Sequence, residues 1–176
     1  MNSDDLLLGM SAFTLSQILV GFAFAFSICA FQFSDQRTVR AGLVLATSAL
    51  AAHFWLLDLH TAAIAAAIAG LRFFIAIFWR SNRLFYFFIT LVLINAVVTY
   101  AGLLTILASA GTSFATWAAF RHSNREFRVY MMCASVLMIC HNLLAPSPAA
   151  VAFEGFLLTS NALAYYRMYF KYSSSS

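Results

Sequence analysis

Two ionisable side chains in the C-terminal part of the chain lie where chemistry is expected. Glu154 is the one acidic residue inside an apolar stretch from Ala149 to Phe170, and a charge in such a stretch is costly unless it faces a partner or a cavity. His141 lies near the end of the preceding apolar stretch and can titrate near neutral pH. Two hypotheses remain open for this pair: a proton-coupled or ligand-binding pair, or a fixed hydrogen bond between helices.

A third polar side chain follows on the same stretch. Asn161 lies seven residues after Glu154, which is two turns of a helix, so both side chains project from one face. An amide on that face can bind a polar solute or join two helices. The sequence therefore predicts Glu154, His141 and Asn161 as substrate-binding residues, whereas Asn95, in a separate stretch, is expected to pack between helices.

The remaining motifs indicate neither catalysis nor a cofactor. The histidines lack the spacing of metal ligands, and the chain contains no nucleophile elbow, P-loop or dinucleotide-binding glycine pattern. We therefore expect no enzymatic activity, no metal and no cofactor. The arginines are spread between apolar stretches instead of covering one polar face, so nucleic acid is not an expected partner.

The composition indicates that helices in a lipid bilayer must position these side chains. Of the 176 residues, 63% are hydrophobic and 9% are charged, compared with about 25% charged in soluble domains. A spanning helix needs about 20 residues, and the alternation typical of a β-barrel is absent. The predicted fold class is an all-α integral membrane protein with seven transmembrane helices: Phe13–Phe33, Ala41–Leu57, Thr61–Trp79, Leu84–Tyr100, Leu103–Phe120, Val129–Leu144 and Ala149–Phe170.

The basic residues predict how the helices are oriented. Lys and Arg favour cytoplasmic loops, and here they collect in alternate connections, which predicts a cytoplasmic C-terminus and an N-terminus outside, with Asp4, Asp5 and Asp58 on the outer side. Two basic residues inside spans are expected at the inner interface, where they would bind lipid headgroups or pair with a loop acid: Arg72 and Arg167. The others are interpreted mainly as topology determinants, with a phosphate-binding or gating role left open for the two R-x-x-R pairs: Arg37, Arg40, Arg125 and Arg128.

An internal repeat accompanies this charge pattern. A shift of the sequence by 88 residues aligns Arg37, Arg40 and His53 with Arg125, Arg128 and His141 without a gap, and residues 26–56 then show seven identities in 31 positions, against about three expected by chance. The pattern predicts two parallel three-helix repeats, 1–80 and 102–172, a linker helix at 81–101 and a serine tail at 173–176. The alternative is a duplication whose copies only pack.

Several short motifs resemble a known family. With them the chain is similar, except in its serine tail, to the small bacterial inner-membrane proteins of the YgjV type. This resemblance implies a location in the bacterial inner membrane but no particular activity. The motifs are Thr116-Trp117-Ala118, Phe120-Arg121, His141-Asn142, Glu154-Gly155, Asn161 and Arg167, with His53-Phe54, Leu56-Leu57 and Arg72 in the first half.

A more distant similarity concerns the whole arrangement. Three plus one plus three helices with the N-terminus outside resemble the SWEET and PQ-loop transporters, in which an Asn on the third helix of each repeat contacts the substrate. Asn161 matches that position in the second repeat, whereas residues 66–72 of the first contain no Asn and the hinge prolines are missing. The sequence thus predicts a carrier of a small polar solute among membrane lipids. The alternative is a non-transporting membrane scaffold or lipid-interacting protein.

Overall fold

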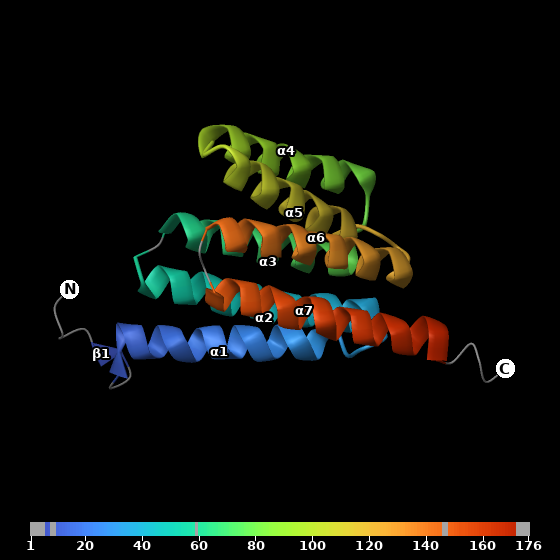
Figure 1. Ribbon diagram of the computed structural model, residues 1–176, viewed down its shortest axis with the longest axis horizontal. Helices are drawn as coiled ribbons and strands as arrows, with labels where there is room; N and C mark the ends of the chain where they lie inside the picture. The colour runs from blue at the N-terminus through green and yellow to red at the C-terminus, as the bar shows by residue number, and fades with distance from the viewer. Residues whose placement is uncertain (1–5, 8–9, 59, 146–147, 172–176) are drawn as a thin grey trace.

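The computed structural model describes residues 6–7, 10–58, 60–145 and 148–171, and these residues form a bundle of seven α-helices (Figure 1). Two-residue strands β1 (Leu6–Leu7) and β2 (Met10–Ser11) precede the bundle, and a π-helical segment, η1 (Arg167–Lys171), ends it. Asp4, Asp5 and the serine tail lie outside the described residues. The helices are α1 (Ala12–Ala30), α2 (Gln36–Leu56), α3 (His60–Phe78), α4 (Asn82–Val98), α5 (Leu103–Ala119), α6 (Asn124–Leu144) and α7 (Pro148–Tyr166).

Lipid is the solvent that suits these helices. Three of them, α1, α2 and α6, are long and apolar enough to cross a membrane, and shorter apolar helices at Ala62–Phe78, Asn82–Val98 and Leu103–Ala119 accompany them. Large apolar side chains such as Phe22, Val97 and Phe156 are exposed on the outer faces of the bundle, where water would leave them unfavourably hydrated. The predicted fold class is confirmed: this is an all-α membrane protein with seven helices.

Two of the helices, α2 and α6, begin five residues earlier than the sequence predicts. The carboxylate of Asp35 accepts the backbone N–H of Thr38 and starts α2, and the hydroxyl of Ser123 starts α6 in the same way through Glu126. Such caps satisfy the free N–H groups of a first turn. Arg40 and Arg128 therefore lie within helices. The apolar stretches alone place them in loops, and that expectation is wrong.

The helices pack in two sets of three. Contacts join α1 to α2 and α2 to α3, and likewise α5 to α6 and α6 to α7; α4 packs on α5 at the edge of the bundle (Figure 1). The sets meet where α1 touches α7 and α3 touches α5. The bounds of α2 and α3, moved along by 88 residues, coincide with those of α6 and α7.

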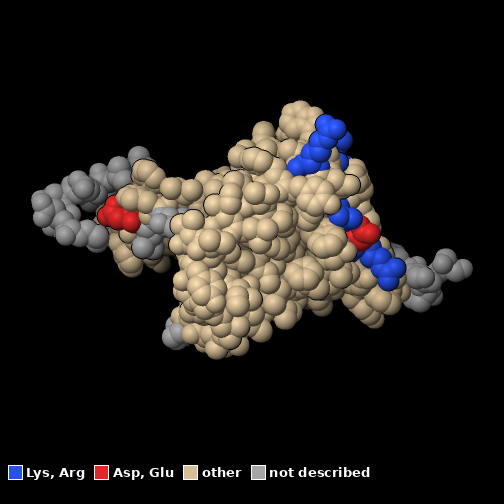
Figure 2. All heavy atoms as spheres, turned by 90° about the horizontal axis from the view of Figure 1, so that it is seen from above, with Lys and Arg blue, Asp and Glu red and all other residues tan. Residues whose placement is uncertain are grey.

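The basic side chains gather at one end of the bundle. On the face in Figure 2 all of the basic side chains lie towards one end with an acidic side chain among them, and an acidic side chain without basic neighbours lies at the other end. The helices run back and forth, so the connections α1–α2, α3–α4 and α5–α6 share this end, which we call the basic end. Because α1 begins at the opposite end and α7 finishes at the basic end (Figure 1), the alternation expected from the loops is present in the structure.

Candidate functional site

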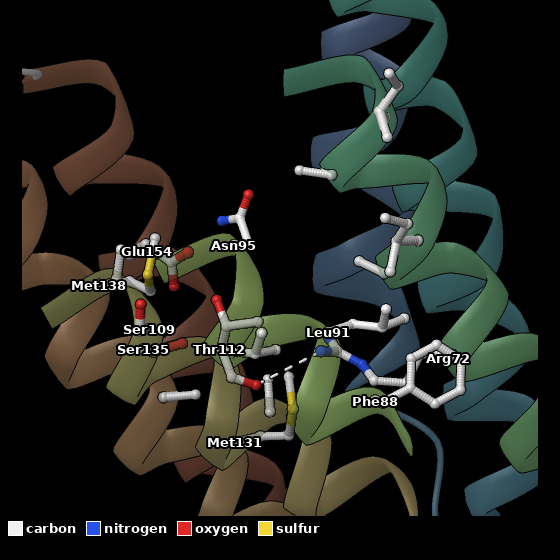
Figure 3. A pocket seen from close by; sticks show the side chains of 18 of the residues that line it. Arg72, Phe88, Leu91, Asn95, Ser109, Thr112, Met131, Ser135, Met138 and Glu154 are labelled. Atoms are coloured by element: carbon white, nitrogen blue, oxygen red, sulfur yellow. Dashed lines mark hydrogen bonds between the residues drawn. The ribbon is translucent and has the colours of Figure 1, made fainter. Parts of the chain in front are cut away.

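A cavity of about 440 Å³ lies among α3, α4, α5, α6 and α7 (Figure 3). Most of its wall is apolar, with side chains such as Ile68, Leu91 and Met138. Six residues with polar side chains also line it, contributed by all five helices: Arg72, Asn95, Ser109, Thr112, Ser135 and Glu154. Apolar walls with a few placed polar groups are typical of binding sites for small molecules.

Arg72 on α3 is a buried cation in this wall, with only 5% of its surface exposed. Its Nη1 donates to Thr116 Oγ1 at 2.7 Å and to the carbonyl of Thr112 at 3.5 Å, and its Nε has no partner among the described residues. The guanidinium also lies 4.9 Å from the ring centroid of Phe73. These partners are all neutral. The structure therefore differs from the expectation that Arg72 reaches headgroups or a loop acid, because the side chain turns inward towards α5.

Glu154 on α7 lies in the same cavity. Ser135 on α6 is within hydrogen-bonding reach of its carboxylate, and Met138 and Ser109 are its other neighbours in Figure 3. The expected partner is elsewhere: Nδ1 of His141 is 3.0 Å from the carbonyl oxygen of Leu104 on α5. The structure thus places Glu154 in a polar-lined cavity but does not bring His141 to it.

Asn161 is buried beyond the cavity, against Arg128. Its Oδ1 accepts a hydrogen bond from Arg128 Nη1 at 3.1 Å, and its Nδ2 donates to the backbone carbonyl of Arg128 at 2.9 Å. The helical face that carries Glu154 and Leu157 into the cavity continues to Asn161, but there Arg128 occupies both ends of the amide. Asn161 is not among the residues that line the cavity.

Arg40 and Arg128 form a reciprocal contact between the two sets of helices, and both are fully buried. From α2, Arg40 donates through Nε to the carbonyl of Ala119 at 3.0 Å and through Nη2 to that of Arg121 at 2.8 Å. From α6, Arg128 donates to the carbonyls of Phe31, at 3.0 Å, and Phe33. Each cation thus satisfies free carbonyls at the C-terminal end of a helix of the other set, where the helix dipole favours positive charge.

The other arginines singled out in the sequence lie at the surface of the basic end. Arg37 and Arg125 are exposed, and Arg125 Nε donates to the hydroxyl of Tyr165 at 2.9 Å. Arg167 is exposed and donates to the side chain of Gln32. Within each R-x-x-R pair, therefore, the first arginine faces solvent and the second is buried.

Five of the six polar residues of the cavity were not predicted to be in it. Arg72 was expected at the inner interface and Asn95 in the packing of a linker helix, and Ser109, Thr112 and Ser135 were not singled out. A weak signal was available on α5, because Ser109, Thr112 and Thr116 recur at intervals of three and four residues and so share a face. Hydroxyls at that spacing are also common in plain helix packing, so the pattern alone does not define a site.

The fold and the cavity define a polytopic α-helical membrane protein with charged groups in an internal site. Residues 14–172 match the family of bacterial inner membrane proteins designated Imp-YgjV. Because this match covers most of the chain, the protein belongs to that family and is a bacterial inner membrane protein.

One relative shows how far this similarity extends. The chain is 27% identical, over 154 residues, to the inner membrane protein YgjV of Escherichia coli (strain K12), and the matched region covers 88% of this chain and 84% of that protein. No solved structure matches the chain.

Proposed function

We propose that the protein is a carrier for a small polar solute, which binds in the cavity among α3 to α7. The observation that carries the proposal is the presence of a buried Arg and a Glu in one cavity within the membrane bundle. Ionisable residues at membrane depth are expensive and usually mark a pathway for a solute or an ion.

The arrangement of the helices supports this proposal. We infer that α1–α3 and α5–α7 are two parallel repeats joined by α4, since the bounds of the second and third helices and the Arg40 and Arg128 contacts recur at the same 88-residue interval. Carriers built from such repeats hold their substrate near the middle of the membrane between moving halves. The cavity has walls from both sets, α3 from the first and α5 to α7 from the second.

We further infer that the basic end faces the cytoplasm. Its arginines, in the connections α3–α4 and α5–α6 and in the first turns of α2 and α6, follow the bias towards the cytoplasmic side, which places the start of α1 outside and the end of α7 inside. A reporter enzyme fused at Ser176 tests this orientation. Activity of a cytoplasmic reporter there supports it, and activity of a periplasmic reporter would reverse it.

Transport itself is tested in proteoliposomes. Uptake of an equimolar panel of sugars, polyols and amino acids, quantified by mass spectrometry, is expected to exceed that of empty liposomes for at least one solute. Substitution Glu154→Gln should reduce that uptake about tenfold or more, while Glu126→Gln, which changes an exposed acid near the start of α6, should not. Uptake equal to that of empty liposomes for every solute would overturn the proposal.

The second candidate is a non-transporting scaffold or lipid-interacting protein. The internal bonding of Asn161 and His141 favours it, because both side chains join helices instead of facing the cavity. This candidate predicts uptake equal to that of empty liposomes for every panel member, with or without Glu154→Gln, and predicts that substitution of Asn161 lowers stability alone.

A further inference from the structure

The cavity holds one cationic and one acidic side chain on opposite sides. In Figure 3, Arg72 enters from α3 and Glu154 from α7, with Thr112 between them and Ser109 and Ser135 beside Glu154. A cavity with charge of only one sign would favour a simple ion, and a cavity with hydroxyl groups alone would favour a sugar or polyol. This cavity has both signs, at separate places.

Neither charge is balanced by the described residues around it. Arg72 donates to a hydroxyl and a carbonyl oxygen, and Ser135 is the hydrogen-bonding group at Glu154. Arg72 and Glu154 lie on opposite sides of the cavity, and each is bonded to neutral groups instead of to the other. An unpaired charge in a medium of low polarity is unfavourable, so both groups gain from a bound counter-charge.

We propose that the ligand of this cavity is a zwitterion, whose anionic group binds Arg72 and whose ammonium group binds Glu154. This inference rests on the proposed function and names the chemical class of the solute. A neutral solute would leave both protein charges unbalanced. A simple anion would leave the charge of Glu154 unbalanced, and a simple cation would leave that of Arg72 unbalanced. The guanidinium suits the anionic group because it offers several N–H donors, among them the free Nε.

The separation of the two protein charges also selects the shape of the ligand. Because Arg72 and Glu154 enter the cavity from opposite sides (Figure 3), a two-point contact favours a ligand whose charges are separated by a chain, as in an ω-amino acid. An α-amino acid carries both charges on one carbon and therefore spans a shorter gap. The hydroxyls of Ser109 and Thr112 and the amide of Asn95 can then bind polar atoms along the chain of the ligand.

Binding to the purified protein tests this assignment. In nanodiscs of phosphatidylglycerol alone, isothermal titration is expected to give rising affinity from glycine through 4-aminobutyrate to 6-aminohexanoate. N-acetyl-6-aminohexanoate and hexylamine, which each keep one charge, should bind at least tenfold more weakly than 6-aminohexanoate. Equal affinity for glycine and 6-aminohexanoate, or for the zwitterion and its N-acetyl derivative, would overturn the two-point contact.

A charge exchange separates recognition from damage to the fold. Glu154→Gln should lose at least tenfold in affinity for 6-aminohexanoate and bind the N-acetyl derivative more tightly than the unmodified protein does. Arg72→Gln should show the opposite preference, for hexylamine. Loss of all binding by both variants, each eluting as a folded protein in size-exclusion chromatography and with the exposed controls Arg37→Gln and Glu126→Gln unaffected, would overturn the assignment.

Two sources could supply this chemistry, a soluble amino acid or the phosphoethanolamine headgroup of a lipid. Added phosphatidylethanolamine should compete with 6-aminohexanoate only if the headgroup enters the cavity. Competition, with no uptake of any solute into proteoliposomes, would support the zwitterion site and overturn the carrier. Uptake of a neutral solute, with no binding of any zwitterion, would support the carrier and overturn the zwitterion site.

Discussion

The N-terminal set of helices, α1–α3, and the C-terminal set, α5–α7, use the same contacts at corresponding positions. Arg40 and Arg128 each bind two carbonyls at the end of the other set's first helix. Nδ1 of His53 lies 2.8 Å from the carbonyl oxygen of Ser16, and Nδ1 of His141 lies 3.0 Å from that of Leu104. In both sets, then, the first and second helices are joined at one end by a histidine, and an arginine crosses to the other set at the basic end.

The sets differ on their third helices. Where α7 has Ser160 and Asn161, α3 has Arg72 and Phe73. Asn161 binds Arg128 on both sides of its amide, and Ser160 donates to the carbonyl of Ile28 at 3.0 Å. Phe73 is buried in the apolar core and makes no such bond, while Arg72 points into the cavity. At these two corresponding positions, therefore, α7 forms hydrogen bonds to α1 and α6, whereas α3 places a charged side chain in the cavity.

The largest expected effect comes from removing the reciprocal arginines. Arg128→Ala should lower the free energy of unfolding by about 4 kcal/mol and Arg40→Ala by about 3 kcal/mol, because each leaves buried carbonyls without donors. Arg128→Ala costs more since Asn161 also loses its partner. We expect a fall of about 10 °C in the melting temperature of the detergent-solubilised protein, measured by size-exclusion chromatography after heating.

The chain supplies matched controls for this comparison. Arg37→Ala and Arg125→Ala remove the exposed arginine three residues earlier in each pair and should change the melting temperature by less than about 2 °C. If the exposed and buried variants melted alike, the carbonyl contacts would not stabilise the bundle. If Arg40→Ala were the more damaging of the two buried variants, the added role of Asn161 would be wrong.

Much of this fold follows from the sequence, because lipid leaves few choices. Backbone groups in a bilayer must bond within their own helix, so seven apolar stretches become seven helices. The starts of α2 and α6 were predicted five residues late, since the polar first turns at Gln36 and Asn124 resemble loops in a hydropathy pattern. The same error assigned Arg40 and Arg128 to loops and concealed their contacts.

The candidate site follows from the sequence only in part. Glu154 could be singled out because one acid in an apolar stretch needs an explanation. Arg72 could not be placed, since a long side chain near a helix end can reach either a headgroup or the interior, and only the packing of α3 on α5 decides between them. Asn161 shares a helical face with Glu154, but the periodicity does not reveal that Arg128 binds both ends of that amide.

A smaller effect is expected where the first two helices of each set approach closely. A Cβ on Gly42 would lie 2.7 Å from Cβ and 3.4 Å from Cα of Ala30, which cannot move aside, so Gly42→Ala should cost about 2 kcal/mol. A Cβ on Gly111 would instead meet the flexible side chain of Met138 at 3.1 Å, so Gly111→Ala should cost less than about 0.5 kcal/mol. Melting temperatures of the two variants measure the difference.

Gly21→Ala is the control for Gly42→Ala and Gly111→Ala, because a Cβ on Gly21 meets nothing within 4 Å. It should be neutral or stabilise α1 by up to about 1 kcal/mol through helix propensity. Equal losses for Gly42→Ala and Gly111→Ala would mean that the α1–α2 and α5–α6 contacts are equally close, contrary to the geometry.

The smallest expected effect concerns the caps of α2 and α6, of which only one can titrate. Asp35 accepts bonds from the backbone N–H and the hydroxyl of Thr38, at 2.9 and 2.8 Å, and these bonds hold the pKa of Asp35 below its ordinary value of 3.8. Because the pKa is lower in the folded state, the cap stabilises α2 fully above the unfolded-state pKa and loses that contribution as the pH falls through the folded-state pKa.

Melting temperatures at pH 6 and pH 3 isolate this contribution. Asp35→Ser gives α2 the cap that Ser123 gives α6, and it should remove about 1 to 2 °C of the total decrease on acidification, a small effect because Asp35 is exposed and its charge is screened. Ser123→Asp should add a similar decrease at α6. If Asp35→Ser and the unmodified protein lost stability equally between these pH values, the lowered pKa of Asp35 would contribute nothing to folding, and the two caps would be interchangeable.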